Sequence, residues 1–415
     1  MLNDTYLIRR AESSDDAKRL HALFSDVFHP EDIGTLAETM FHHMPRMKRK
    51  YWFIAEEKET TKIVSAFVLI PWTWELEGTK LNVAEMGIVG TQEKHRGRGL
   101  MRTLNREFDK TLDEEKFDLA VIQGIPGFYH QFGYHYAIPL ENHINMPLHL
   151  ILETQEKDNY SFRLARVEDI PYLLQADQTY REHFSLSTFR DKANWKYLLT
   201  DSLNTEYGSE YWIMEHRDKP SQFYFRIPRH GFGSGLILSE ISENITYEAL
   251  WYLLSFCKKH AIERKKPYLR LNLHHDSTAS KMAISMGAEQ GKTYAWQIKI
   301  PNITRLLTTM SPILEQRLET SSFKQFSGTL RLNFFKTKVD LHWIKGHLEN
   351  VLPAEGECQD TFSIKADLFP TLCLGHRTWQ EIQYIRPDIS PSSGRSALLV
   401  ETLFPPKKSW IHEQY

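Results

Sequence analysis

The stretch from 94 to 100, Lys-His-Arg-Gly-Arg-Gly-Leu, constrains the fold of this chain more than any other. An extended, largely apolar run from Leu81 to Val89 precedes it. Apolar residues then recur every fourth position, which predicts a helix with one buried face, at Leu100, Leu104, Phe108 and Leu112. A strand that leads through glycines into a helix start predicts an anion site, because the first helix amides lack internal partners. Gly97 and Gly99 let the backbone approach a phosphate closely.

The glycine spacing argues against two common phosphate sites. A P-loop needs Lys-Ser/Thr after its last glycine, and a Rossmann fingerprint spaces its glycines differently. Arg96, Arg98 and Arg102 add positive charge. The stretch resembles the acetyl-CoA pyrophosphate loop of GNAT acetyltransferases, Gln/Arg-x-x-Gly-x-Gly/Ala, with Lys94 in place of Gln or Arg. The alternative interpretation is a surface turn that is basic and glycine-rich.

The segments after the predicted helix continue the GNAT order of elements. Residues 119–122 form a short, wholly apolar run, typical of a buried central strand. Residues 124–134, Gly-Ile-Pro-Gly-Phe-Tyr-His-Gln-Phe-Gly-Tyr, follow it.

A repeat indicates that a second copy of this unit follows a polar linker at 155–159. The pairs are separated by 154 positions (163 − 9) and are Tyr6 and Tyr160, Arg9 and Arg163, Ala11 and Ala165, and Asp15 and Asp169. The second copy has no glycine loop, and Glu240, Glu243 and Asn244 stand in its place. Two carboxylates would repel a pyrophosphate, so we expect a degenerate copy and one acetyl-CoA per chain.

The last third of the chain follows a different pattern. Alternating strands precede residues 362–366 and a short helical stretch that ends in Leu374-Gly375, an order similar to sterol-carrier-protein folds. The predicted fold class is α+β (mixed α/β), with two tandem GNAT-like domains at 1–150 and 160–300 and a sterol-carrier-like domain at 301–415.

The three-part order covers nearly the whole chain and resembles the enhanced intracellular survival (Eis) family of bacterial acetyltransferases. The specific marks are residues 95–102, residues 128–134 and an aromatic last residue. The resemblance implies transfer of an acetyl group from acetyl-CoA to a primary amine of the aminoglycoside, polyamine or lysine type. It also implies a homo-oligomer, commonly a hexamer in that family.

The resemblance assigns roles to individual residues. Tyr129 would protonate the leaving thiolate, and the terminal carboxylate of Tyr415 would help to deprotonate the amine. Cofactor contacts would come from the strand end, the glycine loop and the next strand: Val89, Gly90, Thr91, Arg96, Gly97, Arg98, Gly99, Leu100, Met101, Arg102, Gly124 and Ile125.

The chemistry requires an acid and a base independently of any resemblance. A lysine-type amine, with a pKa near ~10.4, is almost wholly charged at pH 7 and must lose a proton to attack. Glu85, on the fourth predicted strand, competes with Tyr415 for the role of base. Tyr129 would otherwise be an aromatic core residue, and Tyr415 a frayed terminus.

Bulk properties limit the possible partners. The net charge of −2 argues against a nucleic-acid binder. The cysteines Cys257, Cys358 and Cys373 show no CxxC spacing, which predicts a cytoplasmic protein with no metal site. The first residues lack a basic region followed by an apolar stretch, and no run approaches the ~18 apolar residues of a membrane span, so we expect no signal peptide and no membrane partner. The competing function is a carrier that binds acyl-CoA or lipid without catalysis.

Overall fold

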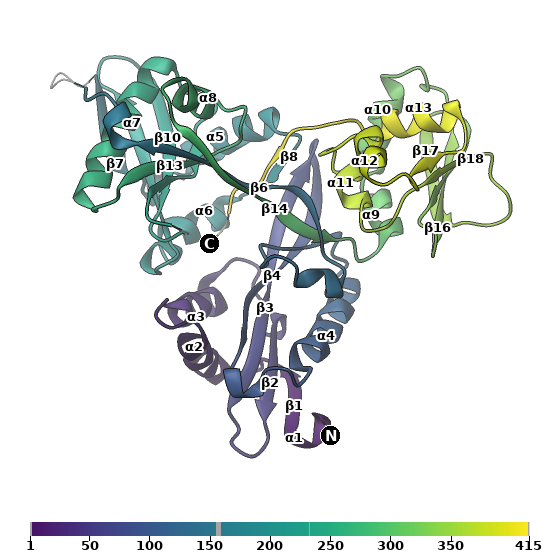
Figure 1. The fold of residues 1–415 in the computed structure, drawn as a ribbon, viewed down its shortest axis with the longest axis horizontal. Coiled ribbons are helices and arrows are strands. Elements are labelled where there is room, and N and C mark those ends of the chain that lie inside the picture. The colour runs from purple at the N-terminus through teal and green to yellow at the C-terminus, as the bar shows by residue number, and fades with distance from the viewer. Residues whose placement is uncertain (1, 155–158, 232, 414) are drawn as a thin grey trace.

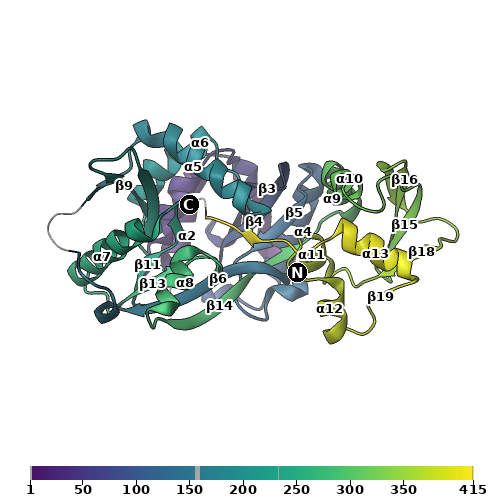
Figure 2. The same cartoon turned by 90° about the horizontal axis from the view of Figure 1, so that it is seen from above.

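A computed structural model describes residues 2–154, 159–231, 233–413 and 415. Figure 1 shows three lobes: the N-terminal lobe at the bottom, the middle lobe at the upper left and the C-terminal lobe at the upper right. We call residues 404–415 the tail. It leaves the C-terminal lobe and runs across to the middle lobe (Figures 1 and 2). The polar linker expected at 155–159 lies outside the described residues except for Asn159.

The N-terminal lobe is a sheet covered on both faces. Its elements are α1 (Leu2–Thr5), β1 (Tyr6–Arg10), α2 (Asp15–Phe28), α3 (Ile33–His43), β2 (Trp52–Glu57), β3 (Ile63–Leu76), β4 (Thr79–Thr91), α4 (Leu100–Glu114) and β5 (Leu119–Ile122). Trp52 and Ile54 belong to the core that includes α2 and α3, whereas Phe53 and Ala55 pack in the core of α4. Successive strand residues point to opposite faces, so burial on both sides explains the nearly unbroken apolar runs.

Strand β4 diverges from β5 partway along its length. It pairs with β3 over almost its full extent, but with β5 only from Val83 to Glu85. The register against β3 shifts between Gly87 and Gly90, where Ile88 has φ +48°. This is a β-bulge, which bends a strand and interrupts its ladder. The end of β4 therefore leaves the β5 ladder and leads into the glycine loop.

The middle lobe repeats the strand order of the N-terminal lobe, except for one added strand, Leu186–Thr188, which pairs with β3. Its strands are β7 (Tyr160–Leu164), β8 (Leu186–Thr188), β9 (Ser209–His216), β10 (Gln222–Pro228), β11 (Leu236–Leu238), β12 (Glu240–Ile241) and β13 (Tyr268–Asn272). Its helices are α5 (Ile170–His183), α6 (Lys192–Leu199), α7 (Tyr247–Glu263) and α8 (Thr278–Ser285). Here β11 pairs in parallel with β13 and β12 pairs with β10, so the counterpart of β4 also divides between two neighbours.

The repeated arginine makes the same kind of contact in both copies. Arg163 forms two hydrogen bonds with Asp169, at 2.7 and 2.8 Å. Arg9 does the same at 2.6 and 3.1 Å, but with Asp16 instead of the aligned Asp15. An arginine on the first strand thus fixes the start of the following helix in each copy. The predicted mixed α/β fold class is confirmed by solved structures with the same fold.

Two long strands join the copies. They are β6 (His135–Pro147) and β14 (Glu289–Lys299), and the large sheet runs β1-β2-β3-β4-β5-β14-β6-β13-β11. Strand β14, from the end of the second copy, pairs with β5 of the first, and β6 pairs with β13 of the second. The division expected at 150 and 160 stays a prediction, and one sheet continues across it.

The C-terminal lobe has its own five-stranded sheet, in the order β17-β16-β15-β18-β19. Its strands are β15 (Gly328–Asn333), β16 (Lys338–Ile344), β17 (His347–Pro353), β18 (Asp360–Ser363) and β19 (Ser390–Pro391). Its helices are α9 (Ile303–Thr309), α10 (Ser311–Glu319), α11 (Phe369–Cys373), α12 (Trp379–Ile385) and α13 (Gly394–Leu403). The likeness of this lobe to sterol carriers stays a prediction.

No helix among the described residues combines the length and the apolar character that crossing a membrane requires.

Candidate active site

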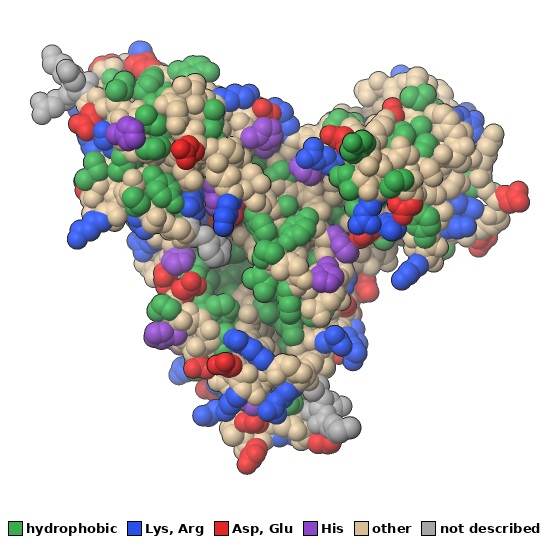
Figure 3. All heavy atoms as spheres, in the orientation of Figure 1, with side chains coloured by type: hydrophobic (Ala, Val, Ile, Leu, Met, Phe, Trp, Pro, Cys, Tyr) green, Lys and Arg blue, Asp and Glu red, His purple; other side chains and the backbone are tan. Residues whose placement is uncertain are grey.

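The divergence of β4 from β5 leads into a cleft of about 530 Å³ in the N-terminal lobe. Its lining comes from the end of α2, the end of β4, the glycine loop and the segment after β5. Lys and Arg side chains gather on the same lobe, below an apolar area at the centre of the face shown in Figure 3. The cleft is large enough for an extended ligand, and its loop end carries the positive charge.

The glycines of the loop adopt the conformation that the sequence requires of them. Gly97 and Gly99 have φ +73° and +79°, and no atom lies within 4 Å of an added Cβ on either. Gly99 is the N-cap of α4. Mainly glycine adopts a left-handed backbone conformation, which explains why glycine occupies both positions. Because glycine has no side chain, the first amides of the helix also stay uncovered. Anions favour such a helix end.

The loop arginines are held by protein atoms. Arg96 Nε donates to the Thr91 carbonyl at 3.1 Å, and Arg98 Nη1 donates to the Tyr6 hydroxyl at 3.0 Å. Their side chains brace the loop against β4 and β1. Positive charge is thus fixed around the helix start instead of moving freely in solvent.

Most of the predicted cofactor residues line this cleft, including Val89, Thr91, the whole stretch from Arg96 to Met101, and Ile125. Gly90, Arg102 and Gly124 are not part of the lining. A Cβ on Gly90 would lie 3.1 Å from the Phe24 ring, and one on Gly124 would lie 2.2 Å from the Tyr129 ring. These two glycines make room for aromatic rings, and Arg102 is exposed.

Tyr129 lines the cleft from the short 3-10 turn Tyr129–Phe132 and is 7% exposed. Burial raises the pKa of its phenol to about 12. The group therefore keeps its proton at neutral pH and can only donate it. The ring packs between the Gly124 backbone and the rings of Phe128 and Tyr134, which fixes its orientation.

The tail brings Tyr415 onto the other candidate base, Glu85. The Tyr415 phenol donates to Glu85 Oε1 at 3.1 Å, and Gln123 Nε2 donates to the Tyr415 hydroxyl at 2.7 Å. Glu85 is 2% exposed, and burial raises the pKa of its carboxyl to about 8. A carboxyl with that pKa can take up a proton near neutral pH, as catalytic bases do. The role expected for the Tyr415 terminal carboxylate stays a prediction.

A second cavity, of about 160 Å³, lies between the N-terminal lobe, the middle lobe and the tail. Gln123 and Tyr415 line it, together with Glu141 of β6 and Glu413 of the tail. Ile125, two residues after Gln123, lines the cofactor cleft instead. The segment after β5 therefore has the cleft beside one end and this cavity beside the other, as a reaction between two ligands requires.

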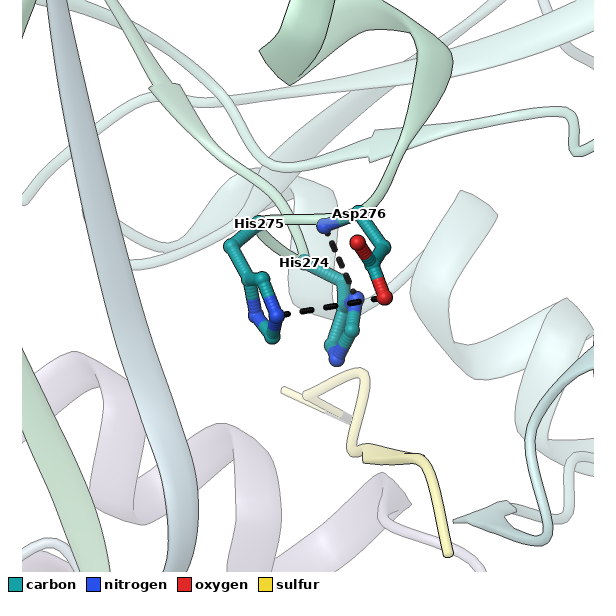
Figure 4. Close-up of side chains that lie close together, drawn as sticks. All are labelled: His274, His275 and Asp276. Atoms are coloured by element: carbon teal, nitrogen blue, oxygen red, sulfur yellow. Dashed lines mark hydrogen bonds and ion pairs between the residues drawn. The ribbon is translucent and has the colours of Figure 1, made fainter.

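One group of side chains in the described part of the chain has the spacing of metal ligands: His274, His275 and Asp276 (Figure 4). The Asp276 carboxylate, however, lies 3.2 Å from the Lys281 ammonium and 3.0 Å from that of Lys408. Two ammonium groups on the single carboxylate disfavour a cation there.

Residues 8–137 match the family model of the acetyltransferase (GNAT) domain. The match spans β4, the glycine loop, α4 and Tyr129, where the cleft lies. The N-terminal lobe is therefore a GNAT acetyltransferase domain, which marks the chain as an enzyme of the acetyltransferase type.

Solved structures share the fold over the full length of the chain. A conserved protein from Enterococcus faecalis, described as a probable N-acyltransferase, has a TM-score of 0.71 at 13% identity, over 99% of this chain and 100% of that one. A GCN5-related N-acetyltransferase from Anabaena variabilis has 0.68 at 14%, over 98% and 99%. Eis1 from Mycobacterium abscessus has 0.62 at 12%, over 99% and 100%. No curated protein matches the sequence.

Sequence reasoning missed Gln123 and the tail residue Glu413. Gln123 stands directly after the predicted strand 119–122, so its position next to a candidate site could have been predicted. Its hydrogen-bond partner Tyr415, 292 positions away, could not. Glu413 contacts Arg226 at 3.1 Å, and no local pattern connects residues so distant in the chain.

Proposed function

We propose that this protein transfers the acetyl group of acetyl-CoA to a primary amine of the aminoglycoside, polyamine or lysine type. Acetyl-CoA occupies the cleft of the N-terminal lobe, with its pyrophosphate at Gly97–Arg102 and its acetyl end beside Val89. The amine enters through the cavity between the lobes. The observation that carries the proposal is the buried Glu85 carboxyl, which accepts a 3.1 Å hydrogen bond from the Tyr415 phenol where β4 leaves β5.

The base acts through the Tyr415 phenol. The phenol oxygen accepts one hydrogen bond from Gln123 and donates its own proton to Glu85. A hydroxyl accepts two hydrogen bonds, so one lone pair remains for an ammonium or amine N–H. The amine proton passes to the phenol oxygen while the phenol proton passes to Glu85. The amine lone pair is then free to attack the thioester carbon.

The acid acts from the cleft side. The amine nitrogen bonds to the thioester carbon, and the carbonyl π electrons move to the oxygen, which gives a tetrahedral intermediate. When this intermediate collapses, the C–S bond breaks and the sulfur takes the electron pair of that bond. Tyr129, whose phenol is protonated at neutral pH and whose pKa burial raises to about 12, donates its proton to the sulfur. The second proton that the attacking nitrogen must lose passes through solvent water and restores the Tyr129 phenol. The oxyanion of the tetrahedral intermediate is placed beside the backbone of the bulged end of β4, where amides can donate to it.

The cavity lining carries charges of both signs, and further carboxylates lie just beyond it. Glu141 and Glu413 line it together with Arg226 and Arg270, and Arg226 pairs with Glu413 at 3.1 Å. Tyr207 and His230 on its wall contact Glu31 and Glu206. The outer carboxylates of Glu31 and Glu206 would attract a protonated polyamine, which would lose its proton only beside Tyr415.

The test is release of free thiol from acetyl-CoA with a panel of polyamines, aminoglycosides and lysine peptides. Tyr129→Phe should lower kcat by about 10²–10⁴-fold with little change in acetyl-CoA affinity. Tyr134→Phe is the matched control, since its buried hydroxyl has no partner among the described residues and its loss should leave kcat near the wild-type value. A chain that binds acetyl-CoA yet transfers nothing to any amine would be a carrier.

A further inference from the structure

The middle lobe has a cleft that corresponds in position to the proposed cofactor cleft of the N-terminal lobe. Side chains of the tail fill this second cleft. In both lobes the lining comes from the end of the first long helix, the end of the divided strand and the segment after the next strand. In the middle lobe these are Phe184, Ile241 and His274, joined by Trp410 and His412 of the tail. About 30 Å³ remains, against about 530 Å³ in the N-terminal lobe.

The middle lobe binds the tail backbone at successive residues. Strand β20 (Ser409–Trp410) pairs in parallel with β8. The Tyr180 hydroxyl donates to the Trp410 carbonyl at 2.9 Å, and the Thr188 hydroxyl donates to the His412 carbonyl at 2.6 Å. The His412 ring stacks on Tyr180 with centroids 4.0 Å apart. These hydrogen bonds hold the backbone of the tail at several points along its length, so the contact does not depend on one buried side chain.

A buried charge network continues the contact toward Tyr415. Arg190 and Glu240 are 0% exposed in their side chains and form two hydrogen bonds, at 2.7 and 2.8 Å. Arg190 also donates to the Glu413 carbonyl at 2.6 Å, and Arg226 donates to the Glu413 carboxylate at 3.1 Å. Glu413, which these two arginines hold, stands two positions before Tyr415.

The start of the tail is held as well. Lys408 lies 3.0 Å from the Asp276 carboxylate, and the Trp410 ring meets the His274 ring edge to face at 5.8 Å. Figure 4 shows the yellow tail passing beside His274. The group that resembles a metal site thus lies where the tail enters the middle lobe.

We propose that the middle lobe is a clamp for the tail, which holds Tyr415 against Glu85 from the surface where a second cofactor would lie. Tyr180, Thr188 and Arg190 are positioning residues that act through Tyr415. This inference rests on the proposed function, because it needs Tyr415 to act in catalysis. It explains why a copy that lacks the glycine loop is still required by the active site of the other.

The test uses the full chain with Tyr180→Phe and Thr188→Val combined, which removes two hydroxyl donors to the tail and preserves shape. We expect kcat to fall by about tenfold or more with acetyl-CoA affinity unchanged. Backbone amides of residues 404–413 should exchange faster with deuterium. Tyr172→Phe is the matched control, because its hydroxyl also donates to a carbonyl, that of Gln222, from the same helix but away from the tail.

A further variant separates positioning from general damage. In a Tyr415→Phe background the clamp substitutions should cost less than about twofold in kcat, because what they position is already missing. An equal loss in both backgrounds, or unchanged exchange in the tail, would overturn the clamp. If the wild-type chain transfers no acetyl group, the proposed function fails, and the exchange measurement then decides whether the middle lobe holds the tail.

Discussion

Glu85 and Glu240 occupy the same place in the two copies of the fold, and their surroundings give them opposite properties. Each lies on the strand that divides between two neighbours, Glu85 opposite Ile70 and Glu240 opposite Arg226. They are 155 positions apart, against 154 for the repeat. Both are buried, with 2% and 0% exposure.

The difference between them is the presence of arginine. Burial raises the pKa of Glu85 to about 8, because its bonds to Tyr415 and Gln123 offset little of the lost solvation. Burial would also raise the pKa of Glu240, but the charge and hydrogen bonds of Arg190 outweigh it and hold that pKa below its usual value. One carboxyl can therefore exchange a proton near neutral pH, while the other is a fixed charge. The environment, more than the residue type, sets the role.

The largest expected effect is the loss of the base. Glu85→Gln should lower kcat by about 10²–10⁴-fold, because it removes the group that finally holds the amine proton. Acetyl-CoA affinity, measured by calorimetry, should hardly change. A variant with near-normal turnover would pass the role of base to the Tyr415 terminal carboxylate or to water.

The matching change in the other copy should damage stability before chemistry. Glu240→Gln leaves Arg190 buried without its carboxylate, and breaking a buried pair in this way costs about 3–5 kcal/mol of unfolding free energy. Urea unfolding monitored by tryptophan fluorescence would measure it. Asp340→Asn, which breaks the buried pair with Arg331 in the C-terminal lobe, serves as the comparison. Only the Glu240 variant should also loosen the tail.

The pH profile distinguishes the two carboxyls without mutation. Glu85 must be ionised to act, and burial raises its pKa to about 8, so kcat/KM should rise by about tenfold or more between pH 6 and pH 8 and level off above that pKa. The residual activity of Glu85→Gln should lose this rise. A profile that is flat above pH 6 would show that Glu85 is not the base.

The smallest expected effect concerns the cofactor loop, which only one copy has. Gly99→Val should weaken acetyl-CoA binding by about tenfold, on the order of 1.4 kcal/mol, because the side chain would stand at the helix start with unfavourable φ. Gly78→Val is the control, since Gly78 has φ +84° and equally open surroundings but lies in the β3–β4 turn.

Titration should give one acetyl-CoA per chain, and two equivalent sites would contradict the degenerate copy.

Local features could be predicted from the sequence. The strand, the glycine loop and the helix of the cofactor cleft are neighbours in the chain. Their pattern was therefore enough to predict that Gly97 and Gly99 form the loop at the helix start. The repeat was readable because Arg163 and Asp169 lie six positions apart. The mixed α/β class followed from the same signals.

Features that depend on distant partners could not be predicted. From the sequence, Glu240 was expected to repel a pyrophosphate. In the structure its carboxylate instead accepts hydrogen bonds from Arg190, 50 positions earlier in the chain. The hydrogen bond between Tyr415 and Glu85 joins residues 330 positions apart. No short-range pattern reports such contacts, because each member by itself has the composition of an ordinary strand or loop.

The insertion of β14 between β5 and β6 affects how the chain can be made. The catalytic sheet stays open at β5 until residues 289–299 have been synthesised, because β14 supplies the missing neighbour. At about 5–20 residues per second, that wait lasts roughly 10–30 s after β5 has formed. During it an apolar strand presents unpaired backbone groups, a template for wrong pairing. Production of this enzyme should therefore be most sensitive to temperature and to chaperone supply during synthesis.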